Sequence, residues 1–146
     1  MDIRVLLNGK KAGLEPVRSA IFSAREAGNV EVRTTWEAGD IDRLVKEACQ
    51  EGCTRIVAGG GDGTVNEVAH AVLQMDEQDR PEVAVMPLGT ANDFATACGI
   101  PADPLQALQL AQTGQVQNVD AARANEYHFI NVASGGFGAQ VTVNTP

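Results

Sequence analysis

Residues 54–64 read Thr-Arg-Ile-Val-Ala-Gly-Gly-Gly-Asp-Gly-Thr, and this stretch decides the fold. The apolar run through Ala58 predicts a short strand that is buried on both faces. Apolar residues then recur at positions 65, 68, 69, 72 and 73, which is the spacing of one buried helix face. A buried strand that passes through glycines directly into a helix is the repeating unit of a parallel α/β sheet.

The same order of strand and helix continues on both sides of this stretch. Apolar runs predict further strands at 3–8, 30–36 and 82–86. Because strands alternate with helices, the sequence predicts a Rossmann-like α/β fold, a parallel sheet with helices on both faces. The expected helix starts are Pro16 as a first helical residue and Asp40 and Asp103 as N-caps, and the expected helix ends are Gly28, Gly52 and Gly114.

The pattern changes from Val116 onward to two strand-like runs around a polar turn at 124–126. We therefore expect an α/β domain at 1–124 and the start of a second, β-rich domain at 125–146. The glycine-rich segment Gly135-Gly136-Phe137-Gly138 is interpreted as a tight bend between the two domains. The last residues resemble a strand that is cut short, which predicts that the chain is part of a longer protein.

Composition disfavours several classes of function. The chain has 146 residues, 44% of them hydrophobic, and a formal net charge of −8. This acidic balance disfavours nucleic acid as a partner, because nucleic-acid binding needs a basic surface. No apolar stretch approaches the roughly 20 residues of a transmembrane helix. Three cysteines (Cys49, Cys53 and Cys98) predict reduced, packed thiols rather than disulfides or a metal pair, in a cytoplasmic protein with at most peripheral membrane contact.

The glycine-rich turn at 59–64 is the first candidate binding site. Glycines let a ligand approach the main chain closely, and the start of a helix presents unpaired N–H groups and a positive dipole end to a phosphate. A P-loop is excluded because the turn has no lysine, and the dinucleotide fingerprint fails because Thr64 stands at its third glycine position. A capping box between Thr64 and Glu67 is an alternative that can hold at the same time.

A second turn of this kind, at 88–93, follows the strand at 82–86. Both turns are expected at the carboxyl edge of the sheet, where α/β proteins bind ligands. For Thr90 and Asp93, a capping box is again the alternative. Asp62, the acid inside the first turn, has three open roles: steering a metal-bound phosphate, taking a proton, or capping the helix.

Two further turns, at 8–10 and 35–37, should meet the glycine-rich turns at the same edge of the sheet. Within them, Trp36 ends the strand at 30–36. Stacking on a nucleotide base and covering the end of the sheet are both open roles for its indole ring.

Two motifs stand out when the glycine-rich turns are taken together. They are Gly-Gly-Gly-Asp-Gly-Thr-Val-Asn-Glu at 59–67 and Pro-Leu-Gly-Thr-Ala-Asn-Asp-Phe at 87–94. The pair resembles the catalytic domain of diacylglycerol kinases, and more closely the bacterial YegS-type lipid kinases. NAD kinases and phosphofructokinases share the Gly-Gly-Asp-Gly element, so the second motif favours the lipid-kinase branch. The resemblance implies that ATP contacts Thr35, Gly60, Gly61, Asp62, Gly63, Thr64, Val65, Asn66, Glu67 and Thr90.

The resemblance implies an ATP-dependent lipid kinase that transfers the γ-phosphate to a hydroxyl of a diacylglycerol-like lipid or phospholipid, with Mg²⁺ accompanying ATP. Kinases of this type carry a second, β-rich domain that holds the general base, the main metal ligands and the lipid pocket. We therefore expect these groups beyond residue 146, no metal ligand on this chain, Asp62 as its one catalytic candidate, and no activity from this chain alone. A NAD kinase-like enzyme with a soluble acceptor and a non-catalytic nucleotide-sensing module remain the alternatives.

Overall fold

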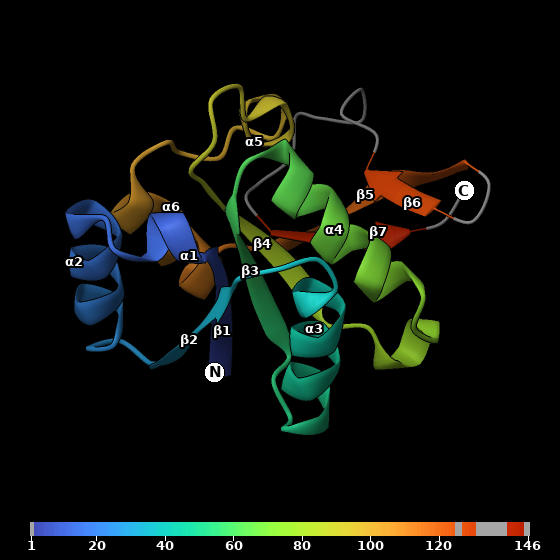
Figure 1. The fold of residues 1–146 in the computed structure, drawn as a ribbon, viewed down its shortest axis with the longest axis horizontal. Helices are drawn as coiled ribbons and strands as arrows, with labels where there is room; N and C mark the ends of the chain where they lie inside the picture. The colour runs from blue at the N-terminus through green and yellow to red at the C-terminus, as the bar shows by residue number, and fades with distance from the viewer. Residues whose placement is uncertain (1, 125–126, 131–139, 145–146) are drawn as a thin grey trace.

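The computed structural model describes residues 2–124, 127–130 and 140–144, and it describes side chains from residue 2 to residue 116 (Figure 1). The expected bend at 135–138 lies outside the described residues. Within the described part of the chain, no helix is long and apolar enough to cross a membrane.

A parallel sheet forms the centre of the molecule, as the sequence predicts. Its strands lie in the order β2-β1-β3-β4, and each neighbouring pair is parallel. The register places Asn8 beside Thr35, and Gly60 beside Pro87, so the strands end at one edge. The strand bounds are β1 Asp2–Asn8, β2 Asn29–Thr35, β3 Arg55–Gly60 and β4 Glu82–Pro87.

Helices cover the sheet in two groups. In Figure 1, α3 and α4 lie side by side in front of the sheet, and α2 packs against α6 away from them. The helix bounds are α1 Gly9–Ala12, α2 Glu15–Ala24, α3 Asp40–Gln50, α4 Asp62–Leu73, α5 Asp93–Ala97 and α6 Pro104–Thr113, with the 3-10 helix η1 at Glu77–Asp79.

The sheet continues beyond β4 with strands from the segment where the sequence pattern changes. The hairpin predicted after Val116 is present as β5 (Val116–Ala124) and β6 (Tyr127–Ile130). The strand β7 (Gln140–Asn144) pairs antiparallel with β4 and parallel with β5, which gives one seven-stranded sheet among the described strands. Because β7 runs against β4, the sheet is mixed. The domain boundary at residue 124 stays a prediction.

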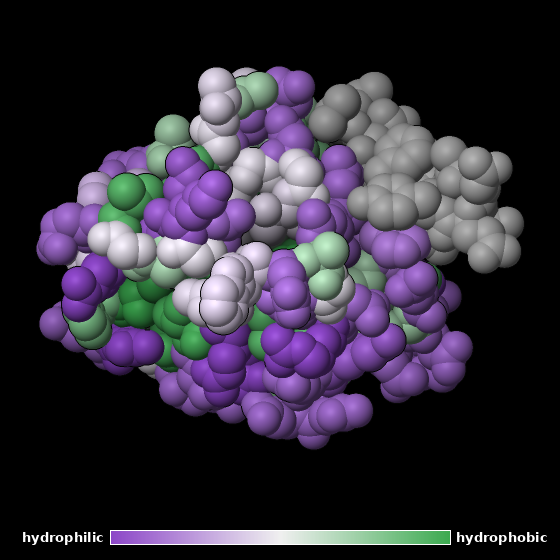
Figure 2. All heavy atoms as spheres, viewed as in Figure 1, coloured by the Kyte–Doolittle hydropathy of each residue, from purple (hydrophilic) through white to green (hydrophobic). Residues whose placement is uncertain are grey.

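The apolar stripes predicted from sequence point into the core. In α4, the residues of the expected stripe are 0–4% exposed, and in α3 the stripe from Ile41 to Ala48 is 0–6% exposed. Figure 2 shows polar side chains over the outer surface of α3, whereas apolar atoms gather between α2 and the strands β1 and β2. The buried stripe of α4 is Val65, Val68, Ala69, Val72 and Leu73.

Two buried arginines tie neighbouring strands together. Arg4 of β1 pairs with Glu31 on β2 at 3.3 Å, and Arg55 of β3 pairs with Glu82 on β4. Arg55 also donates to the carbonyl of Ala111 at 2.7 Å, which links α6 to the sheet. A buried cation is stable only when paired, so these contacts fix which strands lie side by side.

One expected helix boundary is confirmed and three differ. Asp103 caps α6 as predicted, because its carboxylate accepts from the amide of Gln106 at 3.0 Å. Pro16 is the second residue of α2 rather than the first, and α2 ends at Ala24, well before Gly28. Asp40 does not cap α3: Gly39 holds that position with φ of 92°, and Asp40 is the first helical residue.

The three cysteines are free thiols, and Cys53 and Cys98 are buried whereas Cys49 is half-buried. Desolvation by burial raises the pKa of each thiol above its ordinary value. These observations confirm that the cysteines pack as small side chains.

Candidate functional site

The two glycine-rich turns touch at the carboxyl edge of the sheet. The amide of Leu88 donates to the carbonyl of Gly60 at 2.9 Å. A Cβ on Gly89 would lie 2.5 Å from the Cα of Gly61, and a Cβ on Gly61 would lie 3.2 Å from the Cα of Gly89. Both positions therefore need glycine because the two backbones are in contact. This confirms that both turns lie at one edge of the sheet.

Asp62 joins the two turns. Its carboxylate accepts from the amides of Asp93 at 2.9 Å and Phe94 at 3.1 Å, which are the first amides of α5. Of the three roles left open for Asp62, helix capping is the one that these bonds show, and the capped helix is the neighbouring one. The alternative of a capping box from Thr90 is not borne out, because Asn92 occupies the N-cap position and Asp62 supplies the acceptor.

The first turn of α4 begins at Gly61, which occupies the N-cap position and has no side chain to accept a hydrogen bond from the helix. The first helical hydrogen bond runs from the amide of Val65 to the carbonyl of Gly61 at 3.1 Å, so the amides of residues 62–64 have no acceptor within the helix. The alternative of a capping box is not borne out, because Thr64 is the third helical residue rather than the N-cap. These amides and the helix dipole favour an anion at this end of α4.

The glycines of the first turn have different reasons to be glycine. A Cβ on Gly59 would lie 2.4 Å from the Cδ2 of Leu7, and a Cβ on Gly60 would lie 2.5 Å from the Oγ1 of Thr64. A Cβ on Gly63 would meet no atom within 4 Å, although Gly63 lies inside α4. Among the described residues, the space in front of Gly63 is therefore open to a group that approaches the main chain. Glycine at this helical position destabilises the helix by about 1 kcal/mol relative to alanine, so packing within the described residues does not explain it.

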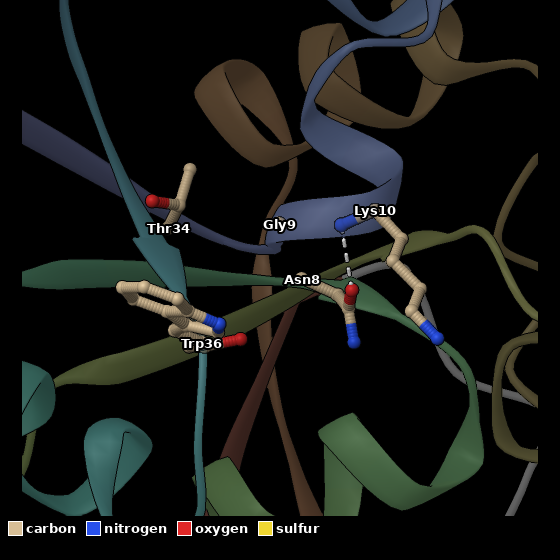
Figure 3. Close-up of a pocket in the computed structure, with 6 residues that line it drawn as sticks. Asn8, Gly9, Lys10, Thr34 and Trp36 are labelled. Carbon is tan, nitrogen blue, oxygen red and sulfur yellow. Dashed lines mark hydrogen bonds between the residues drawn. The ribbon is translucent and has the colours of Figure 1, made fainter.

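A pocket of about 610 Å³ lies at the ends of β1 and β2 (Figure 3). A neighbouring pocket of about 270 Å³ shares Asn8, Thr35 and Trp36 with it, and continues to Thr64 and Glu67 of α4. Together the pockets connect the ends of two strands with the first turns of α4. The lining residues of the larger pocket are Asn8, Gly9, Lys10, Thr34, Thr35 and Trp36.

The structure brings part of the expected site together. Thr35, Thr64 and Glu67 line the smaller pocket, although they lie far apart in the sequence. Val65 is 3% exposed and belongs to the core. Thr90 is exposed on the second turn and is not among the residues that line either pocket.

The remaining expected residues belong to the strand end and the first turns of α4. Gly60 ends β3, Gly61 occupies the N-cap position of α4, and Asn66 is half-buried. Whether they contact ATP stays a prediction.

Asn8 and Lys10 line the larger pocket but were not among the residues expected to contact ATP, although their turn was expected at this edge of the sheet. Trp36, for which base stacking was one open role, directly follows β2 and lines both pockets. The Oδ1 atom of Asn8 accepts from the amide of Lys10 at 2.8 Å, and Figure 3 shows the Nδ2 end of Asn8 pointing away from α1. Trp36 is 96% exposed, so of its two open roles the structure disfavours covering the end of the sheet.

The side chain of Asp40 binds the backbone amide of Trp36. One of its carboxylate oxygens accepts from the amides of Trp36 at 2.7 Å and Glu37 at 2.9 Å. These bonds, the one from Glu37 first, hold the pKa of the Asp40 carboxyl below its ordinary value. The turn at 36–39 is therefore fixed by a charged acceptor rather than by packing.

The described residues do not by themselves fit a magnesium site. They contain no group of three or more His, Cys, Asp and Glu side chains placed to hold a metal ion. The carboxylate of Asp62 already accepts two amide hydrogen bonds. Metal ligands beyond residue 146 stay a prediction.

Comparison with known proteins identifies the family. The chain is 51% identical over 144 residues to a probable lipid kinase YegS-like protein of Enterobacter sp. (strain 638), a match that covers 97% of this chain and 48% of the relative. It is 48% identical over 146 residues to the protein of that name from Chromohalobacter salexigens, covering 99% of this chain and 47% of the relative. The chain thus spans about half the length of the curated relatives it matches.

The solved structures agree with the sequence relatives. A crystal structure of a diacylglycerol kinase from Bacillus anthracis str. Sterne matches with a TM-score of 0.77 and 30% identity, covering 88% of this chain and 45% of that one. The family model of the diacylglycerol kinase catalytic domain matches residues 2–124. This chain therefore belongs to the diacylglycerol kinase catalytic domain family.

Proposed function

We propose that this chain is the nucleotide-binding half of an ATP-dependent lipid kinase. The observation that carries the proposal is the first turn of α4, which has a glycine at its N-cap, is open at Gly63 among the described residues, and adjoins a pocket lined by Thr35 and Thr64. The triphosphate of ATP is a dense anion, and backbone amides at a helix start bind such anions. The side chain of Lys10 lines the larger pocket and adds a local positive charge to a chain whose net charge is −8.

Phosphoryl transfer requires little covalent chemistry from the protein. Its rate depends on holding the γ-phosphate in line with the acceptor and on stabilising the charge that develops. In this proposal the amides of residues 62–64 hold the phosphates, and Thr90 contacts a further phosphate or ribose oxygen. Asp62 positions the second turn by capping α5, beside its expected contact with the nucleotide.

Groups outside this chain complete the proposed reaction. Magnesium that accompanies ATP supplies positive charge next to the phosphates. We place its protein ligands and the general base that deprotonates the acceptor beyond residue 146. This chain alone is then inactive as a kinase.

The proposed acceptor is a lipid hydroxyl, on a diacylglycerol-like lipid or a phospholipid. The support for it is the name carried by relatives that are 48–51% identical to this chain, probable lipid kinase YegS-like. Such an acceptor requires contact with a membrane surface, so we place the full-length protein in the cytoplasm with peripheral access to the bilayer.

The proposal is tested with the full-length protein that contains this chain. Transfer of radiolabel from γ-labelled ATP to extracted lipids, with none to NAD, is the expected result. Transfer to NAD instead supports a NAD kinase-like enzyme, and nucleotide binding without transfer to any acceptor supports a sensing module.

A matched pair of glycine variants tests the site itself. Gly63→Val fills the open space in front of the α4 turn, and Gly13→Val fills equally open space in the loop after α1. Both variants should fold, because neither new Cβ meets an atom within 4 Å. We expect Gly63→Val to lose at least tenfold in ATP affinity by calorimetry, which is about 1.4 kcal/mol, and Gly13→Val to bind as the wild type does. Equal ATP affinity in both variants would contradict the site.

A further inference from the structure

Trp36 is the only tryptophan of the chain, and 96% of its surface is exposed. A tryptophan side chain presents 150–250 Å² of surface that is stabilised by burial, so nearly complete exposure is unusual. In Figure 3 the indole extends from the end of β2 beside Asn8, with Lys10 on the other side of Asn8. The apolar ring therefore lies open at a pocket that is otherwise lined by polar side chains.

The backbone below the ring is held in place. The carboxylate of Asp40 accepts from the amides of Trp36 and Glu37, and Arg43 pairs with that carboxylate at 3.4 Å. Gly39 takes a φ of 92°, which turns the chain back into α3. Because the backbone is already held, packing a ligand on the ring costs the freedom of the side chain alone.

Both pockets at this edge of the sheet include Trp36. The larger one, about 610 Å³, lies within the size range of small-molecule sites and extends from Trp36 to Lys10. The smaller one extends from Trp36 to Thr64 on α4. The smaller pocket therefore gives a ligand with phosphates at the α4 turn a continuous path to Trp36.

We propose that the indole of Trp36 is the stacking platform for the base of the bound nucleotide, and that it makes the site prefer purine over pyrimidine nucleotides. This inference rests on the proposed function, because it assumes that the phosphates bind at the α4 turn. Stacking against an aromatic ring grows with the area of the base, so a purine gains more than a pyrimidine. The hydroxyls of Thr34 and Thr35 and the amide of Asn8 line the same pocket and offer polar partners to the edge of the base.

The experiment uses the full-length protein and three ligands in the presence of magnesium: ATP, CTP and inorganic tripolyphosphate. Calorimetry on Trp36→Ala should show about a tenfold loss of ATP affinity, and a smaller loss for CTP, because the base loses the ring on which it stacks. The affinity for tripolyphosphate should not change. Trp36→Phe should restore most of the ATP affinity, since phenylalanine also stacks.

Phe22→Ala is the matched control. Phe22 on α2 is also an exposed aromatic residue, 58% exposed, and it lies outside both pockets. Its variant should bind ATP as the wild type does, which separates a stacking role from a general effect of losing a surface ring.

The outcomes separate this inference from the proposed function. If Trp36→Ala binds ATP as tightly as the wild type, Trp36 is not the stacking platform. That result would not contradict phosphate binding at the α4 turn. If the wild type binds neither ATP nor tripolyphosphate, the proposed function fails and this inference fails with it. An equal loss of affinity for all three ligands would also overturn the stacking role, because tripolyphosphate carries no base.

Discussion

At the scale of single residues, glycines of the two turns serve two purposes. Gly61 and Gly89 are glycine because their backbones touch, whereas Gly63 faces open space. The sequence shows only that glycines cluster here. It cannot show which glycine is required by a neighbouring backbone and which leaves room for a ligand, because that depends on contacts between residues far apart in the chain.

Alanine substitution separates these purposes. Gly89→Ala places a Cβ 2.5 Å from the Cα of Gly61, so overpacking should lower the free energy of unfolding by about 1–3 kcal/mol. Gly63→Ala should leave the free energy of unfolding unchanged or raise it by up to about 1 kcal/mol, because alanine favours a helix. Urea unfolding followed by circular dichroism measures both. A similar loss in the two variants would contradict the contact between the turns.

Asp40 gives a prediction about pH. The amides of Glu37 and Trp36 lower the pKa of its carboxyl, so the folded state favours the ionised form. The resulting stabilisation is present above the pKa of the unfolded chain and is lost as the pH falls through the lower pKa of the folded chain. Asp40→Asn should therefore lower the melting temperature at pH 7, and this difference should shrink at about pH 3. A difference that grows in acid would contradict the role of the carboxylate.

At the scale of helices and strands, caps were harder to predict than apolar faces. The stripes of α3 and α4 are buried as their spacing predicts, because helix periodicity is a local property. Neither Thr64 nor Thr90 occupies an N-cap position, so neither of the alternative capping boxes forms. The helix α5 receives its acceptor from Asp62, 31 residues before Asp93. A local pattern cannot reveal a cap supplied by another turn.

Removing the cap of α5 tests the coupling between the turns. Asp62→Ala should lower the free energy of unfolding by about 1 kcal/mol and also weaken ATP binding, because the second turn loses its anchor. Asp103→Ala is the matched control, since it removes the cap of α6 away from the site. It should cost similar stability without changing ATP affinity. If both variants bind ATP as the wild type does, the link between the turns has no role in binding.

At the scale of the whole molecule, the sequence predicted the parallel centre and the edge that carries the site. It did not predict that β7 joins β4, because pairing between strands so far apart leaves no local signal. It placed the turn at 8–10 at this edge, but it did not single out Asn8 and Lys10 as site residues. The register between β1 and β2 brings Asn8 beside Thr35, and this register is set by the sheet rather than by either turn.

The central claim is that main-chain amides at the start of α4 bind the phosphates of ATP. A crystal structure of the full-length protein with a non-hydrolysable ATP analogue and magnesium tests it most directly. We predict phosphate oxygens within about 3 Å of the amide nitrogens of Gly63 and Thr64. Phosphates bound at another edge of the sheet, with this turn left empty, would contradict the account.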